Sequence, residues 1–138
     1  MIETTEEMII RHEGLRFTPY KCPAGRLTIG IGRNLEDKGI TEEEALYLFK
    51  NDLDEVERDL SNGIFKGQFY DFPEPVRNAL RDMRFQLGAN GFRSFKKMIT
   101  AFKNKDCQEA IVQMKDSKWY GQATKRANEL IGLIKEVL

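Results

Sequence analysis

Residues 13–32 read EGLRFTPYKCPAGRLTIGIG, and this stretch decides how the rest of the chain is interpreted. It begins with Glu13 at the end of an amphipathic segment, which Gly14 is expected to stop. Residues 18–25 are rich in proline and glycine, which predicts a turn. Residues 26–32 alternate apolar side chains with threonine and glycine, as a strand does. The stretch therefore predicts a helix end, a turn and a strand that fold into a hairpin region.

Three side chains able to do chemistry lie within this stretch. Eight residues separate Glu13 from Cys22, and five separate Cys22 from Thr28. Because a hairpin folds back on the helix end, we expect the three to meet at one cleft. Glycoside cleavage needs an acid for the leaving oxygen and a second group that acts on water or on the anomeric carbon. A carboxyl half-buried in a cleft keeps its proton near neutral pH, so Glu13 suits the first role; the alternative is an ordinary helix-end carboxylate.

Cys22 and Thr28 are the candidates for the second role. A free thiol with a pKa near ~8.5 is mostly neutral at pH 7, whereas a thiolate is a strong nucleophile. Lys21 and Arg26 are expected to favour the thiolate of Cys22, which would attack the sugar or act on a water. The alternatives are an engineered replacement of aspartate and a bystander. Thr28 is expected to orient the attacking water through its hydroxyl, with a plain strand-forming role as its alternative.

Length and composition predict one globular domain. The chain has 138 residues, of which 41% are hydrophobic and 32% charged. This length builds one core but not two independent ones. The apolar stretches are too short to span a membrane, and the acidic start lacks the basic segment of a secretory signal. Two cysteines make no disulfide framework, so we expect free thiols in a chain made in the cytosol. A lone histidine makes no metal site, and no cofactor is expected.

Charge is balanced overall but unevenly distributed. Residues 1–63 carry 8 Lys and Arg against 14 Asp and Glu, a net charge of −6, and residues 64–138 carry 14 against 8, a net charge of +6. One interpretation is two solvated surfaces. The other is that the basic half faces an anionic polymer such as nucleic acid, anionic lipid or bacterial wall.

Helical patterns on either side of the hairpin complete an α+β, mainly helical fold. A helix is predicted over residues 3–12, and Thr41 with Glu44 forms a capping box that opens a helix over about 41–60. At roughly 1.5 Å per residue that helix reaches about 30 Å, long enough to join two lobes. We therefore predict a small β-hairpin lobe over about 14–40, the connecting helix, and a helical lobe over about 64–138 that includes the N-terminal helix.

Proline, glycine and capping residues divide the second half of the chain. A long helix is expected to start at Pro73 and Pro75 and to end at Gly88, before a turn over 88–91. Three arginines follow one another along it, and a solvated charged face explains them better than a nucleic-acid stripe. Ser94, Asp106 and Thr124 are the expected caps of three later helices.

These residues carry a resemblance to a known family that covers nearly the whole chain in the same order. It rests on Glu13–Arg16, Tyr20-Lys21, Thr28–Gly32, Ile40–Phe49, Phe85–Gly88, Ser117–Tyr120 and Arg126-Ala127. In these segments, and in the spacing of Glu13, Cys22 and Thr28, the chain strongly resembles the phage-type lysozymes (muramidases) of glycoside hydrolase family 24. The resemblance implies a lysozyme-like fold with a cleft between two lobes. It also implies hydrolysis of the β-1,4 bond between N-acetylmuramic acid and N-acetylglucosamine.

The resemblance further implies roles for residues outside the hairpin and a cellular setting. Arg126 is expected to pair with Glu13, while Phe85 and Gln86 are expected to line the cleft and contact sugar; a core role is the alternative for Phe85. Many relatives carry aspartate where this chain has Cys22. The implied protein is a monomeric endolysin that acts on peptidoglycan and binds neither nucleic acid nor membrane stably. It would remain in the host cytoplasm until a holin releases it to the periplasm.

Three rival functions remain open at this point. The first is a peptidoglycan-binding protein whose catalysis Cys22 has impaired. The second is a lytic transglycosylase, which needs one glutamate and no partner that handles water. The third is a helical nucleic-acid binder that uses residues 64–138, although it leaves the pattern from Glu13 to Thr28 unexplained.

Overall fold

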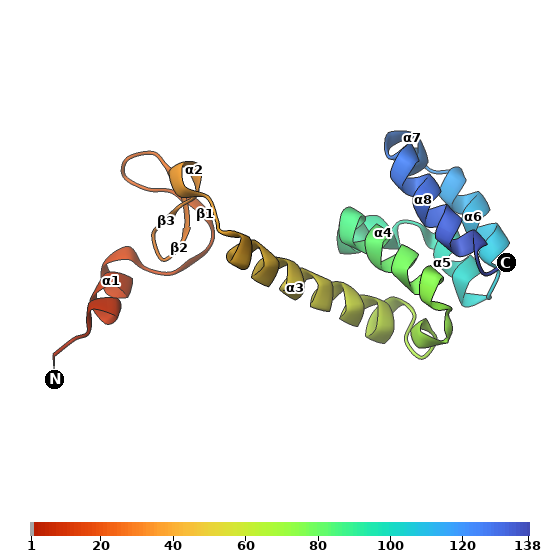
Figure 1. Ribbon diagram of the computed structural model, residues 1–138, viewed down its shortest axis with the longest axis horizontal. Helices are drawn as coiled ribbons and strands as arrows, with labels where there is room; N and C mark the ends of the chain where they lie inside the picture. Colours follow the sequence, from red (N-terminus) through yellow and green to blue (C-terminus); the bar gives the residue numbers. More distant parts are fainter. Residues whose placement is uncertain (1) are drawn as a thin grey trace. The chain divides into compact units, whose positions relative to one another are not determined.

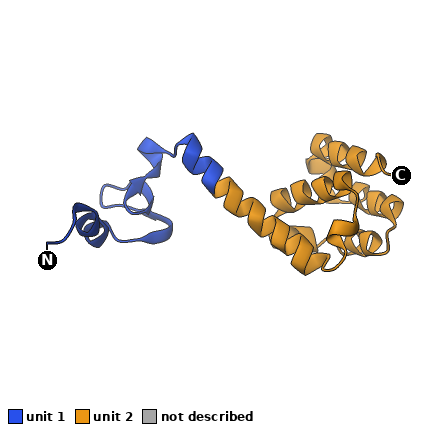
Figure 2. Cartoon of the chain, turned by 60° about the horizontal axis from the view of Figure 1, so that its bottom comes forward, with its two compact units in different colours: residues 1–47 blue, residues 48–138 orange. Residues whose placement is uncertain are grey.

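A computed structural model describes residues 2–138, which form two compact units (Figure 1). Unit 1 ends at Tyr47 and unit 2 comprises Leu48–Leu138, so the boundary falls within the long helix α3 (Glu42–Asp59) (Figure 2). Unit 1 carries a small antiparallel sheet, whereas unit 2 is built from helices and turns. The α+β, mainly helical class is confirmed. The N-terminal helix groups with the sheet in unit 1, and its predicted place in the helical lobe stays a prediction.

Helix α1 (Thr5–Glu13) begins two residues later than predicted and stops before Gly14, as the sequence predicts. The amide of Glu7 donates to the Thr4 hydroxyl at 3.1 Å, which satisfies one of the free donors of the first turn. At the other end Gly14 has φ 76°, and its amide donates to the carbonyl of Ile10 at 2.8 Å. A glycine reaches this conformation without steric cost, so the helix stops there and Glu13 is its last residue.

A three-stranded antiparallel sheet follows, with strands β1 (Arg16–Lys21), β2 (Leu27–Gly30) and β3 (Arg33–Asn34) in sequence order. The turn predicted over residues 18–25 is wrong in its first half, because residues 18–21 belong to β1. Pro19 fits there since β1 is an edge strand whose register shifts between Arg16 and Tyr20. The turn itself runs from Cys22 to Arg26.

The strand predicted over residues 26–32 is shorter in the structure, and its threonine side is the buried one. Strand β2 ends at Gly30, and Ile31 with Gly32 connects it to β3. The period of two is present, but Thr28 is the buried side chain at 3% exposure, while Leu27 and Ile31 are 36% and 43% exposed. The polar face of β2 is therefore the inner face of unit 1.

An ion pair ties the end of the sheet to the start of α3. Arg33 binds Glu44 through both guanidinium nitrogens, at 2.8 and 2.7 Å, and donates to the carbonyl of Gly39 at 3.1 Å. The predicted capping box is confirmed, since Glu44 and Thr41 exchange bonds of 2.9 and 3.1 Å. The Arg33 guanidinium, and next the Thr41 amide, lower the pKa of Glu44 to about 2. The hairpin is thus fixed to α3 within unit 1.

Unit 2 packs its helices around one aromatic-rich core. After α3 come a π-helical turn η1 (Leu60–Ile64), a 3₁₀ turn η2 (Phe69–Asp71) and helices α4 (Glu74–Arg93), α5 (Lys96–Lys103), α6 (Cys107–Lys115), α7 (Lys118–Gln122) and α8 (Thr124–Lys135). Helix α4 packs on α8 and α5 on α6 (Figure 1). The rings of Phe65 and Phe72 meet edge to face at 5.3 Å, and Trp119 is a core residue with 5% exposure. Across residues 2–138, no helix is both long and apolar enough to cross a membrane.

Two boundary predictions in unit 2 are wrong for local reasons. Helix α4 kinks at Gly88, where φ is 75°, but residues 89–93 continue as helix and the predicted turn is confined to that one glycine. Thr124 does not cap α8, because it lies inside the first turn and donates to the carbonyl of Tyr120 at 2.6 Å.

Of the two remaining predicted caps, one is wrong and one is confirmed. The hydroxyl of Ser94 donates backwards to the carbonyl of Gly91 at 2.6 Å and leaves α5 without a side-chain cap. The Asp106 cap of α6 is confirmed, because its carboxylate accepts from the amide of Glu109 at 3.0 Å.

The arginines of α4 bind partners inside unit 2. Arg81 binds Glu57 through two bonds of 2.6 and 2.9 Å, Arg84 donates to Asp59 at 2.7 Å, and Arg77 donates to a backbone carbonyl. The interpretation of these side chains as a solvated charged face is therefore wrong. Arg84 is only 5% exposed, so its charge is matched in the interior rather than offered to a ligand.

Replacing Asp59 is expected to destabilise unit 2. Arg93 and then Arg84 hold the pKa of Asp59 below its ordinary value, and its side chain is 16% exposed. Asp59→Asn leaves the Arg84 charge buried without its counter-charge, so we expect a loss of about 2 kcal/mol in unfolding free energy. Urea unfolding followed by the fluorescence of Trp119, the single tryptophan, measures this.

The pH dependence and a neighbouring variant test the same ion pair. The carboxylate stabilises the fold only when ionised, so its contribution is present above the unfolded pKa of about 3.9 and lost as pH falls through the lowered folded value. The gap between wild type and Asp59→Asn should close as acid is added. Glu55 is the control, since its 67% exposed side chain is 3.9 Å from Arg84 and Glu55→Gln should cost less than about 0.5 kcal/mol. Equal losses in both variants would contradict the buried-pair account.

Candidate active site

The carboxylate of Glu13 lies directly over the backbone of the link between β2 and β3. A Cβ atom built on Gly32 would lie 2.5 Å from Oε2, 2.8 Å from Cδ and 3.2 Å from Cγ of Glu13. The end of α1 and the link between β2 and β3 are therefore in close contact within unit 1. This contact brings the predicted acid onto the same small sheet that carries Thr28.

The half-buried setting predicted for Glu13 is not what unit 1 shows. Its side chain is exposed, with the Gly32 backbone against one side. The sequence pattern identified a helix end but gave no measure of how much of the side chain its own unit would cover. Within unit 1, the Gly32 backbone supports one side of the carboxylate, and the other side is open to solvent.

Cys22 begins the tight turn that joins β1 to β2. Its amide donates to the carbonyl of Arg26 at 2.9 Å, and its carbonyl accepts from the amide of Gly25 at 2.7 Å. The thiol is partly exposed. A hydrogen bond from the Arg26 backbone is the main cause of a lowered pKa for the Cys22 thiol; desolvation opposes it, and the Ala24 backbone and Thr28 side chain add to the lowering. The turn thus stabilises a thiolate.

The expected electrostatic cause of that shift is replaced by a backbone one. Arg26 directs its guanidinium toward Glu36 at 3.7 Å and Asp37 at 3.5 Å, where it meets the carboxylates around α2 (Leu35–Lys38). The contribution of Arg26 to the Cys22 pKa comes from its main chain, and Lys21 is not among the causes. In a tight turn, backbone amides are directed at the sulfur, and counting the nearby cations in the sequence does not reveal them.

Thr28 lies on β2 and pairs with Tyr20 of β1, the residue two positions before Cys22. The Thr28 side chain is buried, and burial fixes its position. Its hydroxyl donates to the carbonyl of Arg26 at 2.8 Å and also interacts with the Cys22 thiol. A hydroxyl has a single proton to donate, so that proton serves the carbonyl or the thiolate but not both at once. Cys22 and Thr28 are brought together as the sequence predicts, and the water-orienting role of Thr28 stays a prediction.

The two residues predicted to contact sugar lie on α4 in unit 2. Phe85 is 39% exposed and packs edge to face on Phe49 at 5.5 Å, so it is not a plain core residue. The Gln86 carbonyl oxygen accepts from the indole N–H of Trp119 at 2.9 Å. Because an indole only donates, this bond leaves the Gln86 amide hydrogens free for an acceptor such as a sugar hydroxyl. Their contact with substrate stays a prediction.

Arg126 is bound within unit 2 as well. Its Nε donates to Asp82 at 2.7 Å, and the two side chains are 41% and 42% exposed. A guanidinium carries five N–H donors, so this bond leaves others for a second carboxylate. The predicted pairing of Arg126 with Glu13 stays a prediction.

Known proteins share this combination of sequence and fold. The family described as phage lysozyme matches residues 10–136. The chain belongs to the phage lysozyme family. By family it is a lysozyme-type peptidoglycan hydrolase with the lysozyme-like fold that its sequence predicts.

Individual relatives of this lysozyme family differ in length and setting. A probable T4-type lysozyme 2 of Dictyostelium discoideum is 26% identical, with 98% of this chain and 95% of the relative covered. A SAR-endolysin of bacteriophage PS119 is 32% identical over 85% of this chain and 73% of its own length. The pre-baseplate central spike protein Gp5 of Enterobacteria phage T4 is 31% identical over 93% of this chain, which spans only 27% of that protein.

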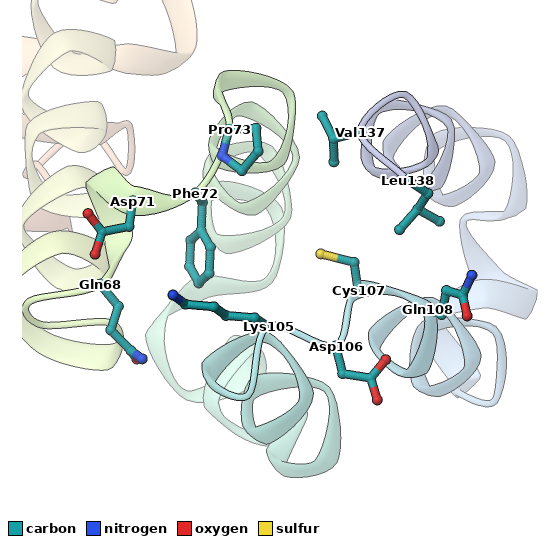
Figure 3. A pocket seen from close by; sticks show the side chains of 10 residues that line it. All are labelled: Gln68, Asp71, Phe72, Pro73, Lys105, Asp106, Cys107, Gln108, Val137 and Leu138. Carbon is teal, nitrogen blue, oxygen red and sulfur yellow. The ribbon is translucent and has the colours of Figure 1, made fainter.

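A pocket of about 430 Å³ in unit 2 holds none of the predicted lysozyme residues (Figure 3). The sulfur of Cys107 points into it. Burial, and next the charge of Asp106, raise the pKa of the Cys107 thiol. This cysteine is therefore the less reactive of the two.

Sequence reasoning did not find two features of the candidate site and part of a third. Gly32 was visible only as one glycine of the strand-like run, and no pattern indicated that Glu13 rests on it. Asp82 gave no signal as a partner of Arg126, because the two lie 44 positions apart. Capping and turn signals pointed to the turn at Cys22 but not to the direction of its amides.

Proposed function

We propose that this chain hydrolyses the β-1,4 bond between N-acetylmuramic acid and N-acetylglucosamine in bacterial peptidoglycan, with Glu13 as the general acid. One observation carries the proposal. In a chain of the phage lysozyme family, the Glu13 carboxyl lies against the link between β2 and β3, and the neighbouring turn and strand carry the Cys22 thiol and the Thr28 hydroxyl. Glycoside hydrolysis requires an acid and a second group of this kind.

Glu13 acts on the leaving group. Its carboxyl proton passes to the bridging oxygen as the bond from that oxygen to the anomeric carbon breaks, and the bonding electron pair stays on the oxygen. The departing sugar leaves with a hydroxyl group, and positive charge develops at the anomeric carbon. The open side of Glu13, away from Gly32, is where the bridging oxygen approaches.

Cys22 supplies the second group as a thiolate. Its negative charge stabilises the positive charge that develops in the transition state. The thiolate also accepts a proton from the water whose oxygen bonds to the anomeric carbon. Thr28 supports that thiolate from the buried side of β2. Solvent exchange then returns the proton from Cys22 to Glu13, which closes the cycle. Direct attack of the thiolate on carbon is the alternative, and it would retain rather than invert the anomeric configuration.

The setting of this activity is part of the same proposal. The relatives named endolysins favour a role in lysis of a phage host. We propose that the chain stays in the host cytoplasm until a holin releases it to the wall. The similarity to a spike protein favours a different setting, in which a lysozyme unit is one part of a larger phage structure. Loss of host lysis when the holin is deleted would distinguish the first setting from the second.

The reaction is tested with purified protein and purified Gram-negative peptidoglycan. We expect new reducing ends, and mass spectrometry should identify them as hydrated N-acetylmuramic acid. Anhydro-muramic ends would show a lytic transglycosylase instead. Binding to the wall without any new ends would show a catalytically impaired peptidoglycan-binding protein.

A further inference from the structure

Among the glycines in residues 2–138, Gly32 is the one at which an added Cβ atom would come closest to another residue, the side chain of Glu13. A Cβ at Gly32 would lie within 3.0 Å of both Oε2 and Cδ of Glu13, closer than packed atoms allow, whereas the other positions have nothing nearer than 3.2 Å. The carboxylate therefore occupies the space that a side chain at Gly32 would fill.

The positive φ at Gly32 already favours glycine, so the effect of the collision with Glu13 has to be separated from that of backbone strain. Gly39, in the same unit, has a positive φ of 64° against 66° at Gly32, and a Cβ there would meet nothing within 4 Å. Both positions strain any other residue. Only at Gly32 does a side chain also collide with the acid, so the two effects can be separated.

The flexible partner in that collision is the acid itself. The Gly32 backbone is held in the short link between β2 and β3, while Glu13 ends α1 and its side chain is exposed. An added methyl group would push the carboxylate away rather than move the sheet. A displacement of about 1 Å at a reacting group is enough to cost about 10²-fold in rate.

We infer that Gly32 is a positioning residue whose bare Cα fixes where Glu13 presents its proton. The inference rests on the proposed role of Glu13 as general acid. Gly32 touches no reacting atom and acts through the carboxylate, so its replacement should reduce the rate of the chemical step and leave substrate binding intact.

The test compares Gly32→Ala with Gly39→Ala in the full chain. We expect both to lower the melting temperature, because both place a Cβ on a backbone with a positive φ. Only Gly32→Ala should reduce kcat on purified peptidoglycan, by about 10- to 100-fold, with KM changed less than about twofold. Equal kcat values in the two variants, or a loss confined to KM, would overturn the inference.

A double variant provides a second readout. In Glu13→Gln the acidic proton is already absent, so there is no proton left to position and Gly32→Ala should cost little further activity when added to it. Additive losses would show that Gly32 acts by another route. A wild-type protein without hydrolase activity would refute the proposed function instead. In that case a crystal structure of Gly32→Ala still decides the inference, through whether the Glu13 carboxylate has moved.

Discussion

Glu13→Gln is expected to lower kcat on purified peptidoglycan by about 10²- to 10⁴-fold. An amide of nearly the same shape fills the place above Gly32 but has no acidic proton for the bridging oxygen. The loss should appear in kcat and in kcat/KM alike, because proton transfer occurs only in the transition state. Release of reducing ends and the clearing of permeabilised Gram-negative cells both measure it.

Glu6→Gln is the matched control for this variant. Glu6 lies on the same helix and is exposed, and its change to glutamine removes one negative charge, as Glu13→Gln does. It should keep wild-type activity and a wild-type melting temperature. If Glu13→Gln retained full activity, the assignment of the acid, and with it the proposed mechanism, would be wrong.

Cys22→Ser is expected to reduce turnover by at least about 100-fold, whereas Cys22→Asp should stay within about tenfold of wild type. Serine has nearly the shape of cysteine but does not ionise near neutral pH, so the charge beside the anomeric carbon is lost. Aspartate restores that charge and a proton acceptor in the same turn. The measurement is kcat for both variants on one peptidoglycan preparation.

Alkylation provides an independent check on the same thiol. The pKa of Cys22 is lowered and that of Cys107 raised, so Cys22 holds more thiolate at neutral pH and should react first with iodoacetamide. Activity should fall in step with modification of Cys22, and Cys107→Ala should be inactivated at the wild-type rate. Full activity in both Cys22→Ser and Cys22→Asp would show that this cysteine is a bystander.

Local patterns predicted much of the fold because their causes lie within a few residues. Thr41 and Asp106 cap helices as predicted, and Thr4 does so too, since each side chain bonds an amide three positions ahead. Ser94 and Thr124 have the same chemistry but donate backwards to carbonyls, a choice that the surrounding chain makes. The same limit explains Pro19, which reads as a turn residue but fits an edge strand.

The candidate site shows the same distinction between what the sequence determines and what folding decides. Sequence determined which groups are present, an acid, a thiol and a hydroxyl at fixed spacing, together with the family to which that spacing belongs. Tertiary structure decided what each group experiences: Glu13 rests on Gly32, backbone amides stabilise the Cys22 thiolate, and the polar face of β2 turns inward. Spacing along a chain fixes the identity of neighbours in a turn or helix. Only folding fixes the direction of an amide or the approach of a side chain across a sheet, because these depend on contacts between segments that the local pattern does not encode.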